Sequence, residues 1–405
     1  MMQSFDVTII GGGMVGLALA RSLKESSLSV AVIETNETPD LSEQPENRVS
    51  AISFASKTLL ENLDAWPLLK TQRITPYHSM QVWEKDSFGK IAFDAKQVNQ
   101  SDLGYIVENR NLQHALLQAV EAQDNVTFFC PDALQNMAIG DGEAWLTLAS
   151  GQQITSKLIV AADGANSGVR KQLNIPLTQW DYEHHAIVAT VKTVEPHQSC
   201  ARQIFTGEGP LAFLPLYEAN TSSIVWSVSP EKAQLLLALD DQAFNQQLSR
   251  TFDNKLGLCE VQGKRQSIPL KMRYARDFAV HRVALIGDAA HTIHPLAGQG
   301  VNLGLLDAAC LAQEILKHAG LGKDIGLYKS LRHFERWRKT EATQMIASME
   351  LLKQLFNGEN PVQKALRDVA LLMADNISPL KKQFIKQAMG LNGEKPDLCL
   401  AVPNN

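Results

Sequence analysis

A glycine-rich run near the N-terminus has the spacing of a phosphate-binding turn. It consists of Gly11-Gly12-Gly13-Met14-Val15-Gly16, a G-x-G-x-x-G pattern between an apolar segment and a helical one. In such a run Gly11 makes a tight turn, Gly13 lets a pyrophosphate approach the backbone, and Gly16 lets the helix pack closely on the strand. The start of the helix offers free N–H groups to phosphates. The run therefore predicts a dinucleotide site.

An acidic residue, Glu34, ends the next apolar segment. A carboxylate at this place can accept hydrogen bonds from both hydroxyls of a ribose. Its charge would repel a 2′-phosphate, which disfavours NADP in this pocket. With strand, helix and Glu34 in register, a dinucleotide site is favoured over a plain tight turn.

A second run, residues 161–170, has the sequence AADGANSGVR. Asp163 and Gly164 follow an apolar segment, and Ser167 and Arg170 enter a helical one. Taken alone, the run is equally typical of an ordinary strand-to-helix turn in which a side chain caps the helix.

A third run extends from Arg282 to Asn302 and is too unusual for a generic turn. Asp288 ends an apolar segment, where a carboxylate could hold a polyol hydroxyl. Pro295 and the segment 298–300 (GQG) make a rigid loop with exposed backbone amides, directly before a helix N-terminus. Such a loop can lie against a flat heterocycle and stabilise negative charge on it.

Two histidines, His291 and His294, lie inside this third run. They have no partner at a metal-ligand spacing, and the five cysteines form no C-x-x-C pair, so we expect no metal site. A structural role is favoured for both histidines, and proton transfer is the alternative.

Hydrophobic periodicity predicts the elements that position these runs. Residues 5–10, 28–34, 157–162 and 282–288 are apolar enough for buried strands, and residues 14–25, 53–70, 108–122 and 300–318 have helical spacing. The first strand–helix–strand unit is about 30 residues long, as a βαβ motif requires. Residues 183–230 contain several β-type runs that indicate an antiparallel sheet, residues 231–250 are helical, and residues 328–390 are almost entirely helical.

Composition limits the class of protein. The chain has 405 residues, 45% hydrophobic and 20% charged, with a net charge of −5. This length predicts two domains, or one large α/β unit with an insertion. The mild negative charge argues against nucleic-acid binding. No run of about 18 apolar residues and no signal sequence is present, so we expect a cytoplasmic location.

The three runs, in this order, resemble the flavoprotein aromatic hydroxylases built on the para-hydroxybenzoate hydroxylase fold. Further runs resemble the ubiquinone-biosynthesis hydroxylases, and most of all the branch that hydroxylates the 2-polyprenylphenol ring at C5. These runs are residues 48–52, 107–110, 180–186, 207–215, 287–304 and 387–391. The resemblance extends from Phe5 to about Leu391.

This resemblance implies an α/β fold in which a Rossmann-like FAD-binding domain of the GR2 type carries an inserted antiparallel β-sheet substrate domain and a helical C-terminal region. The FAD-binding domain would comprise residues 1–75, 100–180 and 276–340. The substrate domain would comprise residues 76–99 and 181–275, and the helical region residues 341–405.

The resemblance also implies which residues bind the cofactor. The predicted FAD ligands are Gly11, Gly13, Gly16, Glu34, Arg48, Arg110, Asp163, Gly164, Asp288, Pro295, Gly298, Gln299, Gly300 and Asn302. No catalytic base is assigned, and His291, Pro295 and Gln299 are candidates from the loop at the flavin. No tyrosine is matched to phenol activation.

The implied activity is a monooxygenase reaction with NAD(P)H and O2, through a C4a-hydroperoxide of the flavin that hydroxylates a polyprenylphenol. No second βαβ unit for a nicotinamide is evident, so NAD(P)H would bind transiently. A set of apolar residues in the inserted domain either lines the ring-and-prenyl pocket or forms sheet core. These residues are Phe205, Phe213, Leu214, Pro215 and Trp226.

The C-terminal stretch combines an apolar stripe with interleaved cations. The stripe comprises Met345, Ile346, Met349, Leu352, Leu355 and Phe356, and the cations are Lys353, Lys364, Arg367, Lys381, Lys382 and Lys386. Packing on the FAD domain is favoured. The alternative is a face for other ubiquinone-biosynthesis proteins or for the inner face of the cytoplasmic membrane, with oligomerisation also open.

Two other functions remain as alternatives on the same scaffold. A flavin-dependent prenyl-lipid reductase would share the FAD runs but not the further matches. A non-catalytic prenyl-lipid carrier would not need the complete flavin loop.

Overall fold

A parallel sheet forms the centre of the first domain in this computed structural model, which describes residues 2–37, 40–41, 46–293, 300–356, 381–382, 385–386, 389–391 and 393–401. Its parallel strands lie in the order β18-β11-β1-β2-β8. Their bounds are β1 (Gln3–Ile10), β2 (Val30–Ile33), β8 (Val126–Phe129), β11 (Gln153–Ala161) and β18 (Val283–Leu285). The inner strands are almost continuously apolar and buried, as a parallel sheet covered on both faces requires.

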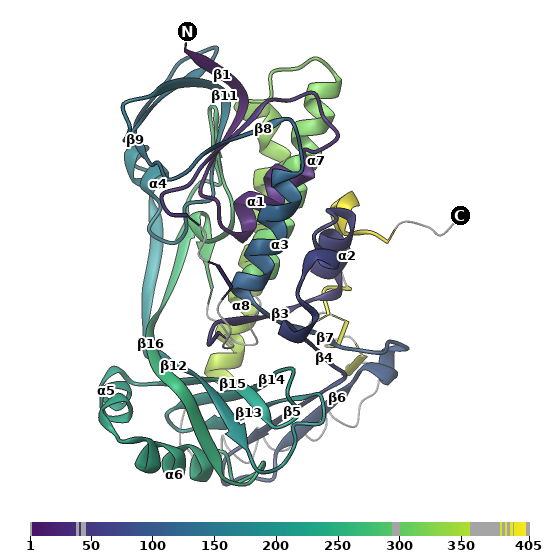
Figure 1. Ribbon diagram of the computed structural model, residues 1–405, viewed down its shortest axis with the longest axis vertical. Coiled ribbons are helices and arrows are strands. Elements are labelled where there is room, and N and C mark those ends of the chain that lie inside the picture. The colour runs from purple at the N-terminus through teal and green to yellow at the C-terminus, as the bar shows by residue number, and fades with distance from the viewer. Residues whose placement is uncertain are drawn as a thin grey trace.

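Helices pack beside this sheet (Figure 1). They are α1 (Met14–Ser22), α3 (Asn109–Glu121), α7 (Gly300–Gly320) and α8 (Tyr328–Phe356). Helix α7 approaches α1 closely because Gly304 has no side chain: a Cβ there would lie 2.8 Å from Val15 Cγ2. The short antiparallel strands β9 (Leu134–Ile139) and β10 (Ala144–Leu148) extend the sheet from β11.

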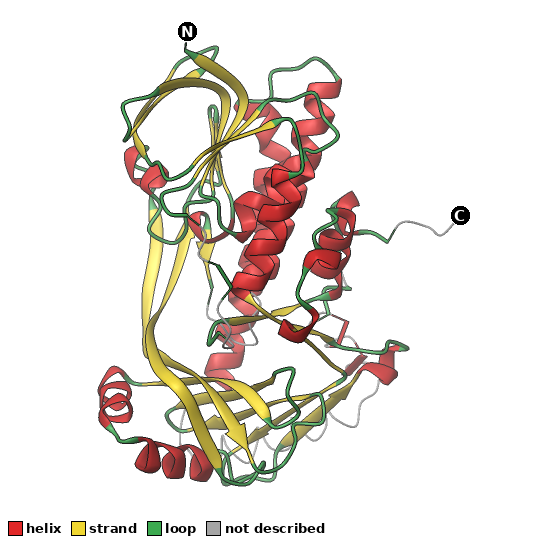
Figure 2. Ribbon diagram, in the orientation of Figure 1, coloured by secondary structure: helices red, strands yellow, loops and turns green. Residues whose placement is uncertain are grey.

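A second sheet of eight strands forms the other end of the molecule (Figure 2). Its order is β19-β16-β12-β15-β14-β13-β5-β6. The bounds are β5 (Ser79–Glu84), β6 (Lys90–Asp94), β12 (Leu177–Thr193), β13 (Cys200–Thr206), β14 (Gly209–Pro215), β15 (Thr221–Val228), β16 (Cys259–Ala275) and β19 (His291–Thr292). All neighbours are antiparallel except β13 and β5, which run parallel. The predicted antiparallel sheet is therefore correct except for this pair.

Two helices cover the outer face of the second sheet, where one was expected over residues 231–250. They are α5 (Pro230–Ala238) and α6 (Asp241–Thr251). The break occurs because Asp240 caps α6, accepting a hydrogen bond of 2.7 Å from the N–H of Ala243.

A three-stranded sheet, β3 (Val49–Ile52), β7 (Gly104–Glu108) and β4 (Ile74–Tyr77), lies between the two large sheets (Figure 1). Helix α2 (Phe54–Asn62) follows β3 and is shorter than the predicted helix over residues 53–70. It ends early because Asp64 adopts a left-handed conformation with φ +57°. A 3₁₀ turn at Trp66–Leu68 replaces the expected helical end.

Two 17-residue strands, β12 and β16, pair along their length and connect the first domain with the second sheet (Figure 1). Strands β5 and β6 join the same sheet from an earlier part of the chain. The inserted sheet is thus made of two separate segments, whereas the exact domain boundaries stay a prediction.

The C-terminal region is helical where the structure describes it. Helix α8 continues to Phe356, with Ile346 packed against the second sheet near Tyr182 and Met272. Lys364, Arg367 and Gln387 lie outside the described residues, and the side chains of residues 352–356 are likewise not described. None of the described helices is both long and apolar enough to cross a membrane.

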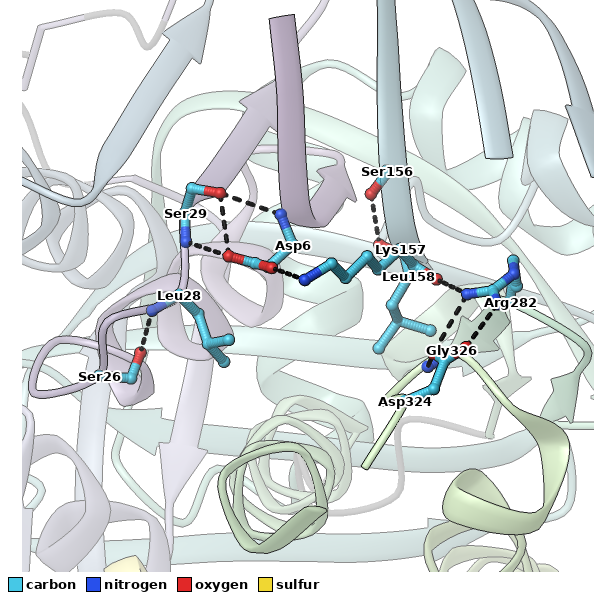
Figure 3. A network of polar contacts seen from close by, with 10 residues as sticks. All are labelled: Asp6, Ser26, Leu28, Ser29, Ser156, Lys157, Leu158, Arg282, Asp324 and Gly326. Carbon is cyan, nitrogen blue, oxygen red and sulfur yellow. Dashed lines mark hydrogen bonds and ion pairs between the residues drawn. The ribbon is translucent and has the colours of Figure 1, made fainter. Parts of the chain in front are cut away.

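A buried arginine fastens the edge of the first sheet opposite the glycine turn (Figure 3). Arg282 is fully buried and donates to the carbonyl oxygens of Gly140, Asp141 and Lys157. Its guanidinium also pairs with Asp324 at 2.5 Å. One side chain therefore joins the β9–β10 turn, β11 and the α7–α8 loop.

Candidate functional site

The three sequence runs meet at one edge of the first sheet. Gly11 follows β1, Asp163 follows β11, and Asp288 follows β18. These strands are parallel neighbours, so their carboxyl ends lie side by side. In open α/β sheets this edge is where ligands bind.

The glycines of the first run differ in the space around them. Gly11 has φ +110°, and a Cβ there would overlap the carbonyl oxygen of Ala162. A Cβ on Gly16 would overlap the carbonyl oxygen of Gly11. At Gly13, by contrast, no described atom lies within 4 Å of the position a Cβ would take.

The first turn of α1 completes this open space. Gly13 begins the helix in an extended conformation, and no described side chain caps it. The first turn contains no acidic residue. Its N–H groups therefore point into open space, which fits the pyrophosphate of a dinucleotide.

Glu34 is held at the end of β2 by two backbone groups. Its Oε2 accepts a hydrogen bond of 2.6 Å from the N–H of Gly12, and its Oε1 accepts one of 3.0 Å from the N–H of Asn36. Each oxygen keeps a further lone pair. The carboxylate is thus oriented beside the glycine turn, with acceptor capacity left for ribose hydroxyls.

Arg48 and Arg110 come together through the pairing of β3 with β7. The N–H of Asn109 donates to the carbonyl oxygen of Arg48 at 3.0 Å. The Arg110 guanidinium pairs with Glu46 at 2.7 Å. The Arg48 side chain is exposed and has no ion-pair partner among the described residues.

Asn47 anchors the residue before Arg48 to the second sheet. Its Oδ1 accepts from the N–H and the hydroxyl of Thr190, both at 3.1 Å, and its Nδ2 donates to the carbonyl oxygen of Lys264. The pairing of β12 with β16 shifts between Val188 and Thr190. This irregularity leaves the Thr190 N–H free for Asn47.

Asp163 has one satisfied and one unsatisfied oxygen. Its Oδ2 accepts from the N–H groups of Gly168 and Val169, at 2.7 and 3.2 Å, and so caps α4 (Gly168–Gln172). Its Oδ1 is buried and has no hydrogen-bond partner among the described residues. The ordinary capping role is therefore present, and an acceptor remains for a ligand or water.

Asp288 lies in the turn that follows β18. Solvent reaches its side chain, yet protein atoms surround it closely, and this desolvation raises the pKa of its carboxyl group. Nearby His291, Arg48 and Arg273 oppose the shift. Arg273 is not among the predicted site residues, because a basic residue in a distant strand carries no local signal for this site.

Part of the third run lies outside the described residues, namely His294, Pro295, Gly298 and Gln299. Asn302 is described and uses its side chain on the backbone. Its Oδ1 accepts from the N–H of Ser53 at 2.9 Å, and its Nδ2 donates to the carbonyl oxygen of Ala51 at 2.7 Å. Together with Gly300, which begins α7, it fixes the start of that helix against β3 and α2.

The chain matches the family described as "FAD binding domain" over residues 4–343. It belongs to that family. The residues at the sheet edge fit FAD, since they combine free helix N–H groups, the open space at Gly13 and unsatisfied carboxylate acceptors. The predicted cofactor, FAD, is thereby confirmed at the level of the family.

Relatives of this flavoprotein cover nearly the whole chain. The 3-demethoxyubiquinol 3-hydroxylase of Escherichia coli is 36% identical, over 96% of this chain and 99% of its own. The ubiquinone biosynthesis monooxygenase COQ6 of Xenopus tropicalis is 35% identical, over 94% of this chain and 92% of its own. The predicted enzyme class, an FAD-dependent aromatic monooxygenase, is confirmed.

The fold also matches solved structures. The p-nitrophenol 4-monooxygenase of Pseudomonas putida has a TM-score of 0.80 at 18% identity, covering 97% of this chain and 100% of its own. This likeness shows that the flavoprotein has the predicted two-sheet architecture.

The five apolar residues predicted for a substrate pocket lie on different faces of the second sheet. Phe213 and Trp226 face α6, where Phe213 stacks on Phe252 at 3.7 Å and Trp226 contacts Phe244. Strand alternation points them away from the first domain, which agrees with the sheet-core alternative for these two residues.

The other three have mixed surroundings. Leu214 faces the first domain, in a cluster with Ala51 and Ile106. Phe205 packs near Val82, and Pro215 is buried at the end of β14. Leu214 thus packs between the second sheet and residues of β3 and β7.

Proposed function

We propose that this flavoprotein hydroxylates the aromatic ring of a polyprenylated phenol in ubiquinone synthesis, with NAD(P)H and O2 as co-substrates. The observation that carries the proposal is the full-length similarity to ubiquinone-biosynthesis hydroxylases, at 34–36% identity across bacterial and vertebrate relatives. The motifs outside the FAD runs agree with it, and they favour the C5-hydroxylating branch.

The residues of the sheet edge would hold the cofactor. The first turn of α1 binds the pyrophosphate through its N–H groups, and Glu34 accepts from a ribose. Asp163 and Asp288 offer acceptors for further hydroxyls. FAD supplies the oxygen chemistry when bound, and the protein supplies position and electrostatics.

The face of the second sheet turned toward the first domain suits an apolar substrate. Leu214, Val225 and Ala201 form a cluster there with Ala51 and Ile106 from β3 and β7. A site bounded by such side chains excludes water. Exclusion of water favours hydroxylation, because hydroxylation competes with the loss of the activated oxygen.

Two positively charged side chains favour the binding of an anionic co-substrate. Arg48 and Arg273 approach Asp288 from different domains, and within the described part of the chain neither forms an ion pair. The two phosphates of a nicotinamide dinucleotide match this charge. We propose transient binding of NAD(P)H here, and docking of the protein at the membrane or on other proteins of the same synthesis as its access to a lipid substrate.

The test is a single-turnover experiment with purified protein reconstituted with FAD. The flavin absorbance should bleach with NAD(P)H under argon, return with O2, and yield a short-chain 2-prenylphenol increased by one oxygen in mass spectrometry. NMR of the product would identify the ring carbon. Prenyl-chain reduction without O2 would instead establish a reductase. The absence of any flavin spectrum after reconstitution would contradict the FAD assignment and make the carrier the next function to test.

A further inference from the structure

A buried carboxylate, Asp307, joins three parts of the first domain. It lies on α7 and is fully buried. Its Oδ2 accepts from the N–H of Gly287 at 2.9 Å and lies 2.6 Å from His291 Nε2. Its Oδ1 accepts from Arg338 Nε on α8 at 2.6 Å.

Gly287 and His291 flank Asp288 in the chain, so one carboxylate holds both ends of the turn that presents Asp288. Gly287 has φ +59°, and a Cβ there would lie 3.2 Å from Val15 Cγ2 on α1. A Cβ on Gly304 of α7 would lie 3.2 Å from Gly287 Cα. The two glycines therefore let the turn and α7 pack directly against each other and against Val15 of α1, and a shift of Asp307 would be transmitted to Asp288.

The charge of Asp307 is maintained despite its burial. Desolvation raises the pKa of the carboxyl group, but His291 and Arg338 together outweigh it and hold the pKa below its usual range. Arg338 is also buried and donates to the carbonyl oxygen of Leu303. Apolar side chains in this place would commonly give equal or greater stability. Stability alone therefore does not account for three polar side chains here.

We propose that Asp307, together with His291 and Arg338, is a positioning residue that sets the place of Asp288 in the FAD site. The proposal rests on FAD binding at the sheet edge and not on the identity of the aromatic substrate. It adds a positioning role to the cofactor site and does not depend on hydroxylase activity.

The test is FAD binding to the apoprotein, measured by flavin fluorescence. Asp307→Asn keeps the shape of the side chain but replaces one acceptor oxygen with an amide NH2 group, which is a donor. The groups around it, from Gly287, His291 and Arg338, are donors as well. We expect its Kd for FAD to rise roughly 10- to 100-fold, as for residues that orient metal ligands.

A conservative pair at His291 keeps the proposal testable if Asp307→Asn fails to fold. His291→Gln retains an N–H donor toward Asp307 and should bind FAD nearly as the parent does, whereas His291→Leu should bind it as weakly as Asp307→Asn. Equal FAD affinity of the two variants would overturn the proposal.

The matched control is Asp324→Asn, which removes the charged partner of buried Arg282 at the opposite edge of the same sheet. It should lower the free energy of unfolding while the Kd for FAD stays unchanged. If Asp324→Asn weakens FAD binding as much as Asp307→Asn, general destabilisation explains the effect and the positioning role is wrong. An unchanged Kd in a folded Asp307→Asn protein leads to the same conclusion.

Discussion

Single glycines of the first run tolerate a methyl group very differently. Gly13 has an ordinary extended backbone and open space, so Gly13→Ala should leave the free energy of unfolding nearly unchanged, within about 0.5 kcal/mol. It should nevertheless weaken FAD binding, because the methyl group occupies the predicted place of the pyrophosphate. Thermal unfolding and fluorescence titration measure the two effects.

Gly16→Ala is the contrasting variant, since its Cβ would overlap the backbone of Gly11 and force α1 away from β1. We expect a loss of stability of about 1–3 kcal/mol from this overpacking. Gly142→Ala, which also has open space, serves as control. FAD binding by Gly13→Ala equal to that of Gly142→Ala would contradict the assignment of the phosphate site.

The lowered pKa of Asp307 predicts how its stabilising effect depends on pH. The group is ionised more readily in the folded than in the unfolded protein, where its pKa is near 3.8. Its contribution is therefore fully present above that value and is lost as the pH falls through the lower pKa of the folded state. The difference in unfolding free energy between the parent and Asp307→Asn should be constant from pH 7 to about 5 and shrink below about 4. Urea unfolding across this range measures it, and a difference that grows on acidification would contradict the ionised state.

Local and distant residues of the site differ in how well sequence predicts them. Glu34, Asp163 and Asp288 each end an apolar segment, and the edge they share follows from parallel strand geometry. Arg273, Asp307 and Arg338 were missed, because their partners lie far away in the chain and no local pattern marks them.

At the scale of elements, alternation along β14 separates two neighbouring residues into different environments. Phe213→Ala should lower stability by about 3–5 kcal/mol by opening the core beneath α6, and the KM for a prenylated phenol should not change. Leu214→Ala faces the first domain, and we expect it to raise that KM roughly tenfold.

Denaturant unfolding and steady-state kinetics on the two variants test this division. A raised KM for Phe213→Ala together with an unchanged KM for Leu214→Ala would place the substrate on the α6 face of the second sheet and contradict this division. Adjacent residues of a strand point to opposite faces of the sheet, but the sequence does not tell which of these faces meets the first domain. That information depends on how β12 and β16 connect the sheet to the first domain.

Element ends were predicted less well than element types, for a similar reason. The helix expected over residues 53–70 stops at Asn62, where an aspartate in the left-handed region redirects the chain. The helix expected over residues 231–250 is interrupted by the cap at Asp240. In both cases a single residue ends the helix. Hydrophobic periodicity is read over many residues and therefore does not detect it.

For the whole molecule, the Arg282 cluster and the FAD site occupy opposite edges of one sheet. Arg282→Met should cost about 3 kcal/mol of unfolding free energy, because four backbone and carboxylate acceptors lose a buried donor. The Kd for FAD should not change. Arg276→Met, at an exposed arginine, is the control and should alter stability by less than about 0.5 kcal/mol. A large loss of FAD affinity in Arg282→Met would show that the two edges are coupled.

The order of strands in the first sheet has a consequence for synthesis of the protein. β1 lies between β2 and β11, yet β11 and β18 are made after the first 150 and 280 residues, and Arg338 later still. A nascent chain can form the glycine turn early, but the edge that holds FAD stays incomplete until these late segments leave the ribosome. Folding is therefore governed by contacts between distant parts of the chain, which are slow to form. FAD therefore binds only near the end of translation. Until then the chain contains an incomplete sheet, and this intermediate is the form that needs protection from aggregation.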